Sequence, residues 1–314
     1  MKTEVTFDSA GLRLAGHLYT PDGAHSGDNR ASEPRAAIVV GHPGGGVKEQ
    51  ASGLYAERLS RAGFVTLAFD AAFQGESEGT PRGLEDPAHR IEDIKAAVSF
   101  LSVRDEVDAA RIGVLGVCAS GGYAVPAAAT DHRIKAVATV SAADIGAQFR
   151  DGADGTQDPA VLQGLLDAAA EARTAEARGE GMTAFPIFPE SEEQARAGGQ
   201  HVFEGWEYYC TDRAQHPRSV KAMPWSSVDR IAQFDAFRFI GLIAPRPVLM
   251  VVGSEAVTAP MSTAALARAG APKELFRIDG ASHVDLYDKD EYVSPAVTKL
   301  TGFFQDSLVG VPAR

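Results

Sequence analysis

The stretch Gly116-Val117-Cys118-Ala119-Ser120-Gly121-Gly122 lies between two apolar segments of different character. Residues 111–115 before it form a short apolar run typical of a buried strand, and residues 123–129 after it predict a buried helix despite Pro126. A nucleophile with small residues two positions to either side, between a strand and a helix, is typical of a nucleophile elbow. The flanking residues must be small because larger side chains would collide with so sharp a turn.

The register of this turn admits two nucleophiles. Cys118 has Gly116 and Ser120 two positions away, whereas Ser120 has Cys118 and Gly122. Gly116 is the natural small residue before the turn, and Ser120 is small enough to follow it, so we interpret Cys118 as the nucleophile. Otherwise Ser120 would be the nucleophile rather than a small structural residue.

The composition is that of an ordinary globular protein. Of 314 residues, 45% are hydrophobic and 23% are charged, which leaves room for one large α/β domain and an insertion. The formal net charge is −12, and a polyanion would be repelled, so nucleic acid and anionic membrane surfaces are poor partners. A homo-oligomer is compatible with the sequence.

The sequence carries no recognisable targeting or cofactor signal. No run reaches the roughly 18 apolar residues of a membrane-spanning helix, and residues 1–7 lack the apolar core of a signal peptide. Two cysteines, Cys118 and Cys210, cannot build a disulfide framework, and their surroundings indicate no zinc site. We therefore expect reduced thiols, a cytoplasmic location, and neither metal nor cofactor.

Strand and helix patterns alternate along most of the chain. This alternation predicts the α/β class, with a mostly parallel central sheet and helices on both of its faces. Expected strands cover residues 3–7, 12–19, 36–40, 64–69, 112–117, 134–140, 247–252 and 274–278. Expected helices cover residues 54–62, 90–101, 123–129, 263–269 and 292–308, and a polar loop is expected at 22–34.

Residues 147–240 interrupt this alternation and contain no parallel-strand pattern. They hold an alanine-rich helix at 161–177, a proline-punctuated turn at 185–189, and a further helical segment at 192–209. We therefore expect residues 1–146 and 241–314 to form the core and residues 147–240 to form an inserted helical cap.

The cap is expected over the carboxyl ends of the strands, where open α/β sheets bind their ligands. Its aromatic residues are candidates for lining a substrate site. These candidates are Phe185, Trp206, Tyr208 and Trp225. Alternatively, the insertion is a structural helical subdomain, and each aromatic residue belongs to its core.

A base for Cys118 is predicted in the last loop of the core. His283 follows the expected strand at 274–278, within Asp279-Gly280-Ala281-Ser282-His283. A histidine on that loop points back toward the elbow, and its place after the nucleophile in the chain fits a catalytic unit built on such an elbow.

The stretch Gly41-His42-Pro43-Gly44-Gly45-Gly46, after the first central strand, predicts half of an oxyanion hole. One N–H is expected from Ala119, the residue after the nucleophile. Pro43 has no N–H, so Gly44 is the best second donor, with Gly45 behind it. A phosphate-binding loop is not expected because the Gly-Lys-Ser/Thr ending is missing.

Together these motifs resemble the α/β-hydrolases of the dienelactone-hydrolase-like group, in particular a subgroup of uncharacterised bacterial hydrolases and fungal polyketide transferases. The matching motifs lie at residues 41–50, 73–79, 116–122, 131–137 and 279–288. The resemblance implies a nucleophile at position 118, a histidine at position 283, and attack on the carbonyl of an ester, lactone or thioester. It does not fix the substrate.

The third catalytic residue departs from the pattern of this family. Relatives often carry an Asp in the loop after the penultimate core strand, and residues 251–258 contain none. Glu255 is our first candidate for the acid, Asp144 the second and Glu49 the third. Alternatively, Glu255 is a solvated loop residue and Glu49 favours a helix N-terminus.

A cysteine nucleophile reduces the need for that acid. A thiol is closer to ionising than a serine hydroxyl, and its pKa can fall by several units at a helix N-terminus beside an imidazolium. We therefore expect a Cys–His pair that works with a weak orienting group.

The expected function is that of a hydrolase or acyltransferase acting through a covalent acyl-enzyme on Cys118. Its substrate would be an ester, lactone or thioester, including a polyketide-like one. The alternative is a catalytically degenerate member that binds a hydrophobic ligand under its cap, which the missing Asp motivates. A dehalogenase or epoxide hydrolase would need an Asp nucleophile and is disfavoured.

Overall fold

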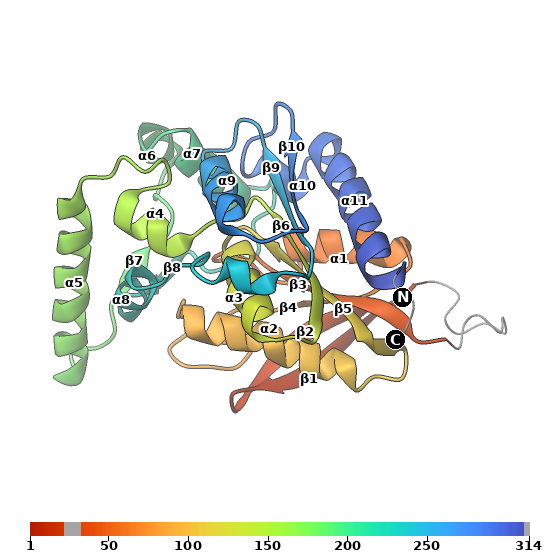
Figure 1. Ribbon diagram of the computed structural model, residues 1–314. Coiled ribbons are helices and arrows are strands. Elements are labelled where there is room, and N and C mark those ends of the chain that lie inside the picture. The colour runs from red at the N-terminus through yellow and green to blue at the C-terminus, as the bar shows by residue number, and fades with distance from the viewer. Residues whose placement is uncertain (22–32, 311–314) are drawn as a thin grey trace.

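The computed structural model describes residues 1–21 and 33–310, and an eight-stranded sheet runs through it (Figure 1). The strands lie in the order β1 (Lys2–Ser9), β2 (Leu12–Tyr19), β4 (Val65–Phe69), β3 (Arg35–Gly41), β5 (Val107–Val117), β6 (Ile134–Val140), β9 (Val248–Gly253) and β10 (Lys273–Ile278). β2 pairs antiparallel with both β1 and β4. All the other neighbouring pairs of this sheet are parallel.

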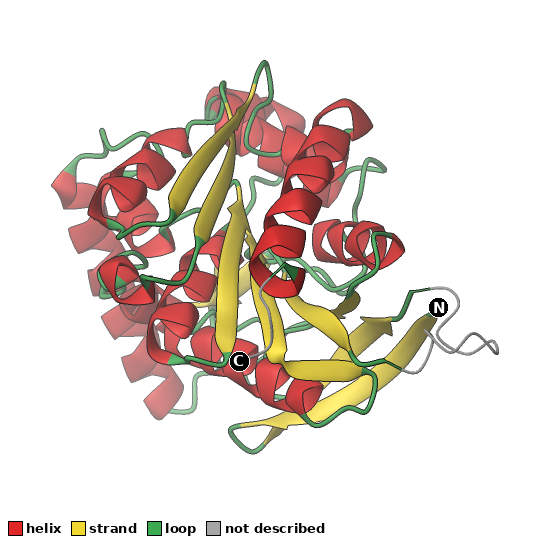
Figure 2. Ribbon diagram, turned by 45° about the vertical axis from the view of Figure 1, so that its right-hand side comes forward, coloured by secondary structure: helices red, strands yellow, loops and turns green. Residues whose placement is uncertain are grey.

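Helices cover both faces of this sheet, as Figure 2 shows. One face packs against α2 (Pro87–Ser102), α3 (Ala119–Thr130) and α9 (Ala259–Arg268). The other packs against α1 (Ala51–Arg61) and α11 (Asp290–Phe304), which continues into the π-helical turn η3 (Gln305–Val309).

The central strands read as continuous apolar runs because both of their faces are buried. Side chains alternate between the two faces along a strand. Val39 and Val114 therefore join the apolar cluster around α2 and α3, whereas Ile38 and Leu115 join the cluster around α1 and α11. All four side chains are fully buried.

The strands β3, β5, β6, β9 and β10 run parallel, so their carboxyl ends meet at one edge of the sheet. The loops that leave this edge include residues 42–50, the elbow at 118, and residues 254–258 and 279–284. Every predicted catalytic segment therefore lies at the edge where open α/β sheets bind ligands.

Between β6 and β9 the chain leaves the sheet and forms mainly helices. These are α4 (Ile145–Asp151), α5 (Pro159–Ala177), α6 (Glu192–Ala197), α7 (Gln200–Cys210), α8 (Ser226–Ala232) and the 3-10 turn η2 (Ile240–Ile243). Two short strands, β7 (Ala184–Pro186) and β8 (Ala222–Pro224), pair antiparallel within this segment. We call residues 147–240 the insertion; its helix α5 stands at the edge of the molecule in Figure 1.

The fold predicted from the sequence is confirmed, with element ends shifted by a few residues. Two details of the insertion differ. The predicted turn at 185–189 begins within β7, and the predicted helical segment at 192–209 divides into α6 and α7. Gly199 separates these two helices in a left-handed conformation, with φ of 93°.

The short helix α10 (Asp285–Asp288) follows the last loop of the core. The predicted polar loop at 22–34 lies almost wholly outside the described residues. Within residues 1–21 and 33–310, none of the helices combines the length and apolar content needed to cross a bilayer.

Candidate active site

Cys118 lies at the tip of the turn between β5 and α3. Its φ of 54° and ψ of −119° are sparsely populated for a residue with a side chain, as at many functional sites. Two hydrogen bonds hold this conformation: the Cys118 N–H donates to Val140 O at 2.9 Å, and the Ala143 N–H donates to Cys118 O at 3.0 Å. The neighbouring strand β6 and the loop after it therefore fix the elbow.

The small residues around Cys118 have the steric role that the sequence predicts. A Cβ atom added at Gly116 would lie 2.1 Å from Ser120 O, and one at Gly122 would lie 2.5 Å from Ala143 O. At Gly121 the added atom would lie 2.7 Å from the Cβ of Ala142. All three contacts are closer than real side chains approach, so the turn requires glycine at these positions.

Ser120, the alternative nucleophile, is engaged in the scaffold. Its hydroxyl donates to His42 O at 2.5 Å and accepts from an Arg90 N–H at 3.1 Å. The side chain is buried beneath the loop that follows β3 rather than lining the cavity. These contacts favour Cys118 as the reactive residue of the turn.

Three hydrogen-bond donors lower the pKa of the Cys118 thiol. Two are the backbone N–H groups of Ala119 and Gly44, and the third is the hydroxyl of Tyr287. Ala119 and Gly44 are the two residues that the sequence predicts as oxyanion donors. The structure brings both beside the sulfur that would attack a substrate carbonyl.

His283 reaches this group through Tyr287. The Nε2 atom of His283 lies 2.9 Å from the hydroxyl of Tyr287, and its Nδ1 atom lies 2.6 Å from the hydroxyl of Thr258. No direct hydrogen bond joins the described side chains of Cys118 and His283, so the contacts run from sulfur to tyrosine to imidazole to threonine. We call these four residues the Cys118–Thr258 chain.

Burial favours the uncharged forms of the ionisable groups in this chain. Desolvation raises the pKa of the Cys118 thiol, an effect that the three nearby donors oppose. Burial, together with His201, holds the pKa of His283 well below its usual value. Burial also keeps the pKa of Tyr287 well above its usual value.

These directions correct the expectation of a thiolate stabilised by an imidazolium. That pair would require a histidine that stays charged, whereas the environment of His283 disfavours its cationic form. These directions favour a resting chain of thiol, phenol, neutral imidazole and alcohol.

A cavity of about 330 Å³ opens beside Cys118. Its wall is mainly apolar, with contributions from the core and from the insertion. The lining residues from the insertion include Phe149, Leu165, Phe185, Ile187, Met223 and Ile231. Gly44 and Ala119, which supply the two N–H donors, line the same cavity.

A family model described as the alpha/beta hydrolase fold matches residues 37–290. The chain belongs to the α/β-hydrolase fold family. It is an enzyme of the α/β-hydrolase type, and the resemblance seen in its sequence motifs is confirmed.

Full-length relatives of this α/β-hydrolase are bacterial and fungal. It is 40% identical to the uncharacterized protein YcjY of Escherichia coli (strain K12), over 87% of this chain and 89% of YcjY. The crystal structure of hypothetical protein PA2218 from Pseudomonas aeruginosa superposes with a TM-score of 0.89 and 36% identity, covering 98% of this chain and 94% of that one. Acyltransferase drtE of Aspergillus calidoustus is 24% identical over 86% of this chain and 87% of its own length.

The three candidate acids lie away from His283. Glu255 is exposed, and its carboxylate accepts a hydrogen bond from Ser254 at 3.2 Å. Asp144 caps α4 and accepts from the N–H groups of Ala147 and Ala236. Glu49 pairs with Lys48 and Arg218.

Thr258 occupies the place in this α/β-hydrolase where the sequence predicts a carboxylate. It lies three residues beyond Glu255, and its side chain is buried against Nδ1 of His283. Glu255 is directed elsewhere because its backbone N–H is tied to Ala281 O at 3.0 Å, which leaves its side chain on the surface. An alcohol orients this histidine without adding charge.

The loop that carries Gly44 is held by a buried histidine. Nδ1 of His42 lies 2.7 Å from Pro43 O, and Nε2 accepts from the Ala71 N–H at 3.1 Å. Arg90 lies 2.9 Å from the same Nε2 and donates to His42 O at 2.8 Å. Burial and then Arg90 hold the pKa of His42 well below its usual value, so His42 positions the loop as a neutral ring.

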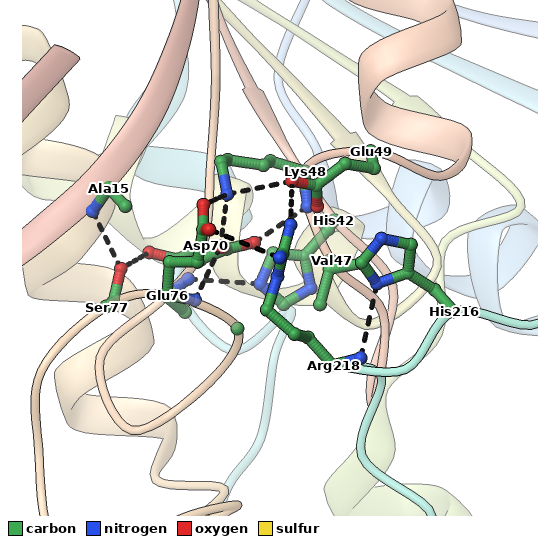
Figure 3. A network of polar contacts seen from close by, with 12 residues as sticks. Ala15, His42, Val47, Lys48, Glu49, Asp70, Glu76, Ser77, His216 and Arg218 are labelled. Carbon is green, nitrogen blue, oxygen red and sulfur yellow. Dashed lines mark hydrogen bonds and ion pairs between the residues drawn. The ribbon is translucent and has the colours of Figure 1, made fainter. Parts of the chain in front are cut away.

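On its other side the same loop is anchored by charge (Figure 3). The ammonium of Lys48 is buried and lies 2.8 Å from Asp70, 2.5 Å from Glu76 and 3.0 Å from Glu49. Asp70 is also fully buried and accepts from the Lys48 N–H at 2.8 Å. With Arg218, which pairs with Glu49 and Glu76, these residues form what we call the Lys48 network.

The insertion reaches this loop at two neighbouring points. Arg218 joins the Lys48 network, and the Val220 N–H donates to Gly45 O at 2.8 Å. Gly45 has φ of 69°, and a Cβ atom there would lie 2.7 Å from Val220 O. The glycine is required at this position because the insertion packs directly on its backbone.

Of the aromatic residues predicted to line the site, only Phe185 reaches the cavity wall. Tyr208 is buried, with its hydroxyl accepting from the Ala51 N–H at 3.1 Å. Trp225 packs on the far side of Phe185, and Trp206 stacks on Phe203. Packing within the insertion turns the two tryptophans away from the cavity, whereas contacts with the core direct Tyr208.

Sequence reasoning missed Tyr287, Thr258 and His201. The ring of His201, on α7, lies edge-on to that of His283 with centroids 5.0 Å apart. Tyr287 follows His283 by four residues, a spacing at which helical side chains meet, and this was the one available signal. Within the described residues, no three His, Cys, Asp or Glu side chains form a group that would hold a metal ion.

Proposed function

We propose that this α/β-hydrolase cleaves an ester, lactone or thioester through a covalent acyl-enzyme on Cys118. The observation that carries the proposal is the meeting of a strained cysteine with two N–H donors at the wall of an apolar cavity. In acyl transfer such N–H groups stabilise the negative charge of the tetrahedral intermediate.

In the proposed reaction the Cys118 sulfur attacks the carbonyl carbon as its proton passes to His283. The N–H groups of Ala119 and Gly44 hold the resulting oxyanion. Collapse breaks the bond to the leaving alcohol or thiol, which takes the proton back from Nε2 of His283. An incoming water or alcohol, deprotonated by the same nitrogen, then releases the acyl group.

The cavity supports an acyl part that is mostly apolar. Phe149, Phe185 and Ile231 offer hydrocarbon surface, and one wall carries the buried carboxylate of Glu85 beside Gln74. Glu85 accepts from Tyr123 at 2.6 Å and from Gln74 at 2.6 Å, which fixes this polar wall in place. We therefore propose that the insertion is a cap whose inner side selects the acyl chain.

Acyl-enzyme formation tests the proposal directly. The protein is incubated with p-nitrophenyl esters of increasing chain length and with acyl thioesters, and its intact mass is followed. A single acyl adduct on Cys118 is expected, together with product release. Cys118→Ala should lose both, and Cys210→Ala should keep both, because Cys210 lies on α7 outside the described cavity wall.

The opposing candidate is a ligand-binding protein without turnover. The observation that favours it is the uncharged resting chain, in which neither the thiol nor the imidazole is activated by a formal charge. Binding of apolar esters without any adduct or product would support that candidate and overturn the acyl-enzyme proposal.

A further inference from the structure

We propose that Tyr287 is a catalytic residue of this site and relays the proton between Cys118 and His283. The inference rests on the proposed acyl-enzyme function and adds a participant to it. The hydroxyl of Tyr287 lies 2.9 Å from Nε2 of His283, and it is also the side-chain hydrogen-bond partner of the Cys118 thiol.

The position of Tyr287 is fixed on several sides. Its ring is buried and meets the ring of Tyr208 edge-on, with centroids 5.1 Å apart. The preceding residue is anchored as well, because the hydroxyl of Tyr55 donates to Leu286 O at 2.8 Å. A side chain held in this way keeps its hydroxyl against Nε2 of His283.

The hydrogen bonds can be assigned in one direction that leaves Nε2 of His283 free to accept a proton. In that state Nδ1–H donates to Thr258, the phenol of Tyr287 donates to Nε2, and the thiol of Cys118 donates to the phenol oxygen. The hydrogens of the thiol, the phenol and the Nδ1–H group then each have an acceptor, as buried polar groups require.

The relay moves two protons and leaves the tyrosine neutral. As sulfur bonds to the carbonyl carbon, the S–H proton passes to the phenol oxygen while the phenol proton passes to Nε2. The products are the acyl adduct with its oxyanion and an imidazolium held by Thr258. A free tyrosinate is avoided because burial makes ionisation of Tyr287 unfavourable, so the two transfers are coupled.

Other ionisable groups around the chain come from three elements, of which α3 contributes Tyr123. α7 contributes His201, Tyr208 and Tyr209, and α2 contributes Arg90, which favours the thiolate form of Cys118 from a distance. Burial lowers the pKa of His201 and raises those of both tyrosines on α7. Tyr287 is the group among these that touches both reacting partners.

The alternative is that Tyr287 blocks the site and must swing aside before Cys118 and His283 meet. The two ideas predict opposite results for Tyr287→Phe, which removes the hydroxyl and keeps the ring. A relay predicts that the acylation rate constant falls by about a hundredfold or more, the usual contribution of proton transfer catalysis. A gate predicts an unchanged or higher rate.

Tyr55→Phe is the matched control. It removes a hydroxyl that is equally buried and is bonded to the residue next to Tyr287, yet lies outside the Cys118–Thr258 chain. Both variants are prepared with Cys210→Ala, and single-turnover acylation is measured with one p-nitrophenyl ester. We expect Tyr55→Phe to acylate within about threefold of the parent protein.

A second readout separates the relay from a packing effect. The rate of Cys118 alkylation by iodoacetamide is measured against pH, and its midpoint should rise in Tyr287→Phe because the thiolate loses a donor. If Tyr287→Phe does not fold, 3-fluorotyrosine at position 287 preserves the ring volume and supplies a more acidic phenol. The midpoint should then fall.

The relay is overturned if Tyr287→Phe has the same acylation rate and alkylation midpoint as Tyr55→Phe. It is also overturned if 3-fluorotyrosine at position 287 leaves the alkylation midpoint unchanged. Failure of the underlying function looks different. In that case the Cys210→Ala parent itself forms no adduct, or Cys118→Ala acylates as fast as the parent.

Discussion

Two groups of buried polar residues meet at the loop after β3, and they are built in opposite ways. The Lys48 network is ionic and ties the loop to the end of β4 and to the insertion. The Cys118–Thr258 chain has no formal charge at rest and lies on the side of the loop that faces the cavity. Fixed charges hold the backbone that supplies Gly44, while neutral hydrogen bonds are placed where a proton must move.

This difference predicts how substitutions in each group should affect the protein. A buried ion pair that loses one partner leaves an uncompensated charge in the interior, which destabilises the fold. A neutral chain that loses one hydroxyl forfeits a smaller free energy of folding but interrupts proton transfer. Substitutions in the Lys48 network should therefore act on stability, and those in the chain on chemistry.

The largest effect is expected from Cys118→Ser, which should lower the rate of ester cleavage by more than about a hundredfold. The hydroxyl is a weaker nucleophile than the thiol, and the neutral chain offers no carboxylate to strengthen His283. Steady-state kinetics on one p-nitrophenyl ester measure the effect, and urea denaturation checks that the fold is unchanged. A serine variant as active as the parent would show that the chain activates alcohols equally well.

Lys48→Met should destabilise the fold by about 3–5 kcal/mol, because it leaves Asp70 buried without its cation. The free energy of unfolding in urea measures this loss. Arg61→Met is the control, since Arg61 pairs with Glu57 on the surface and its removal should cost under about 1 kcal/mol. Equal losses in the two variants would remove the distinction between the buried network and a surface pair.

Thr258→Val should reduce acylation about tenfold and destabilise the fold by about 1–3 kcal/mol, because Nδ1–H of His283 is left buried without an acceptor. Thr258→Ser keeps the hydroxyl and should behave like the parent. Glu255→Gln should also leave kcat unchanged, since its carboxylate is exposed and bonded to Ser254. A large loss of kcat in Glu255→Gln would show that Glu255, as the sequence suggests, orients His283 in place of Thr258.

Stability should fall as the pH drops from 7 toward 5.5. The unfolded chain takes up protons on histidine near pH 6.5, whereas His42, His201 and His283 have lowered pKa values and stay neutral in the folded protein. The unfolded state therefore binds more protons. As a result, the free energy of unfolding falls by up to about 1.4 kcal/mol per pH unit for each histidine. Urea unfolding at several pH values should show a smaller slope for His201→Phe, and an unchanged slope would contradict this origin.

The smallest effect is expected from Arg218→Ala. This side chain joins the insertion to Glu49 and Glu76 but is 39% exposed, so its loss should cost under about 1 kcal/mol. Salt should reduce that cost further because exposed ion pairs are screened. A loss of stability comparable to that of Lys48→Met would show that Arg218 contributes as strongly as the buried members of the Lys48 network.

Local sequence patterns predicted the frame of this site well. The elbow could be found because Gly116, Cys118 and Gly121 act within one turn, and the order of strands placed His283 at the same edge. Thr258 and Tyr287 could not be assigned from the sequence. Their roles depend on which side chains point inward from the loop after β9 and from α10, and only the folded structure shows this. Trp206 and Trp225 were misplaced because packing inside the insertion sets their direction, and Tyr208 because it packs against the core.

The protonation expected from the sequence also failed for a physical reason. A helix N-terminus favours a thiolate, but desolvation opposes it, and only the folded environment shows that burial prevails at both Cys118 and His283. The residues were predictable from spacing, whereas their charge state required the surroundings.

Titration of the Cys118 thiol tests the central claim most directly. Thiolate absorbance near 240 nm is followed against pH in Cys210→Ala, with Cys118→Ala/Cys210→Ala subtracted as the reference. A neutral resting chain predicts that Cys118 remains a thiol at pH 7 and ionises at or above the ordinary value of about 8.5. A midpoint below pH 7 would show a thiolate–imidazolium pair. It would contradict the claim that the Cys118–Thr258 chain is neutral at rest, in contrast to the ionic Lys48 network.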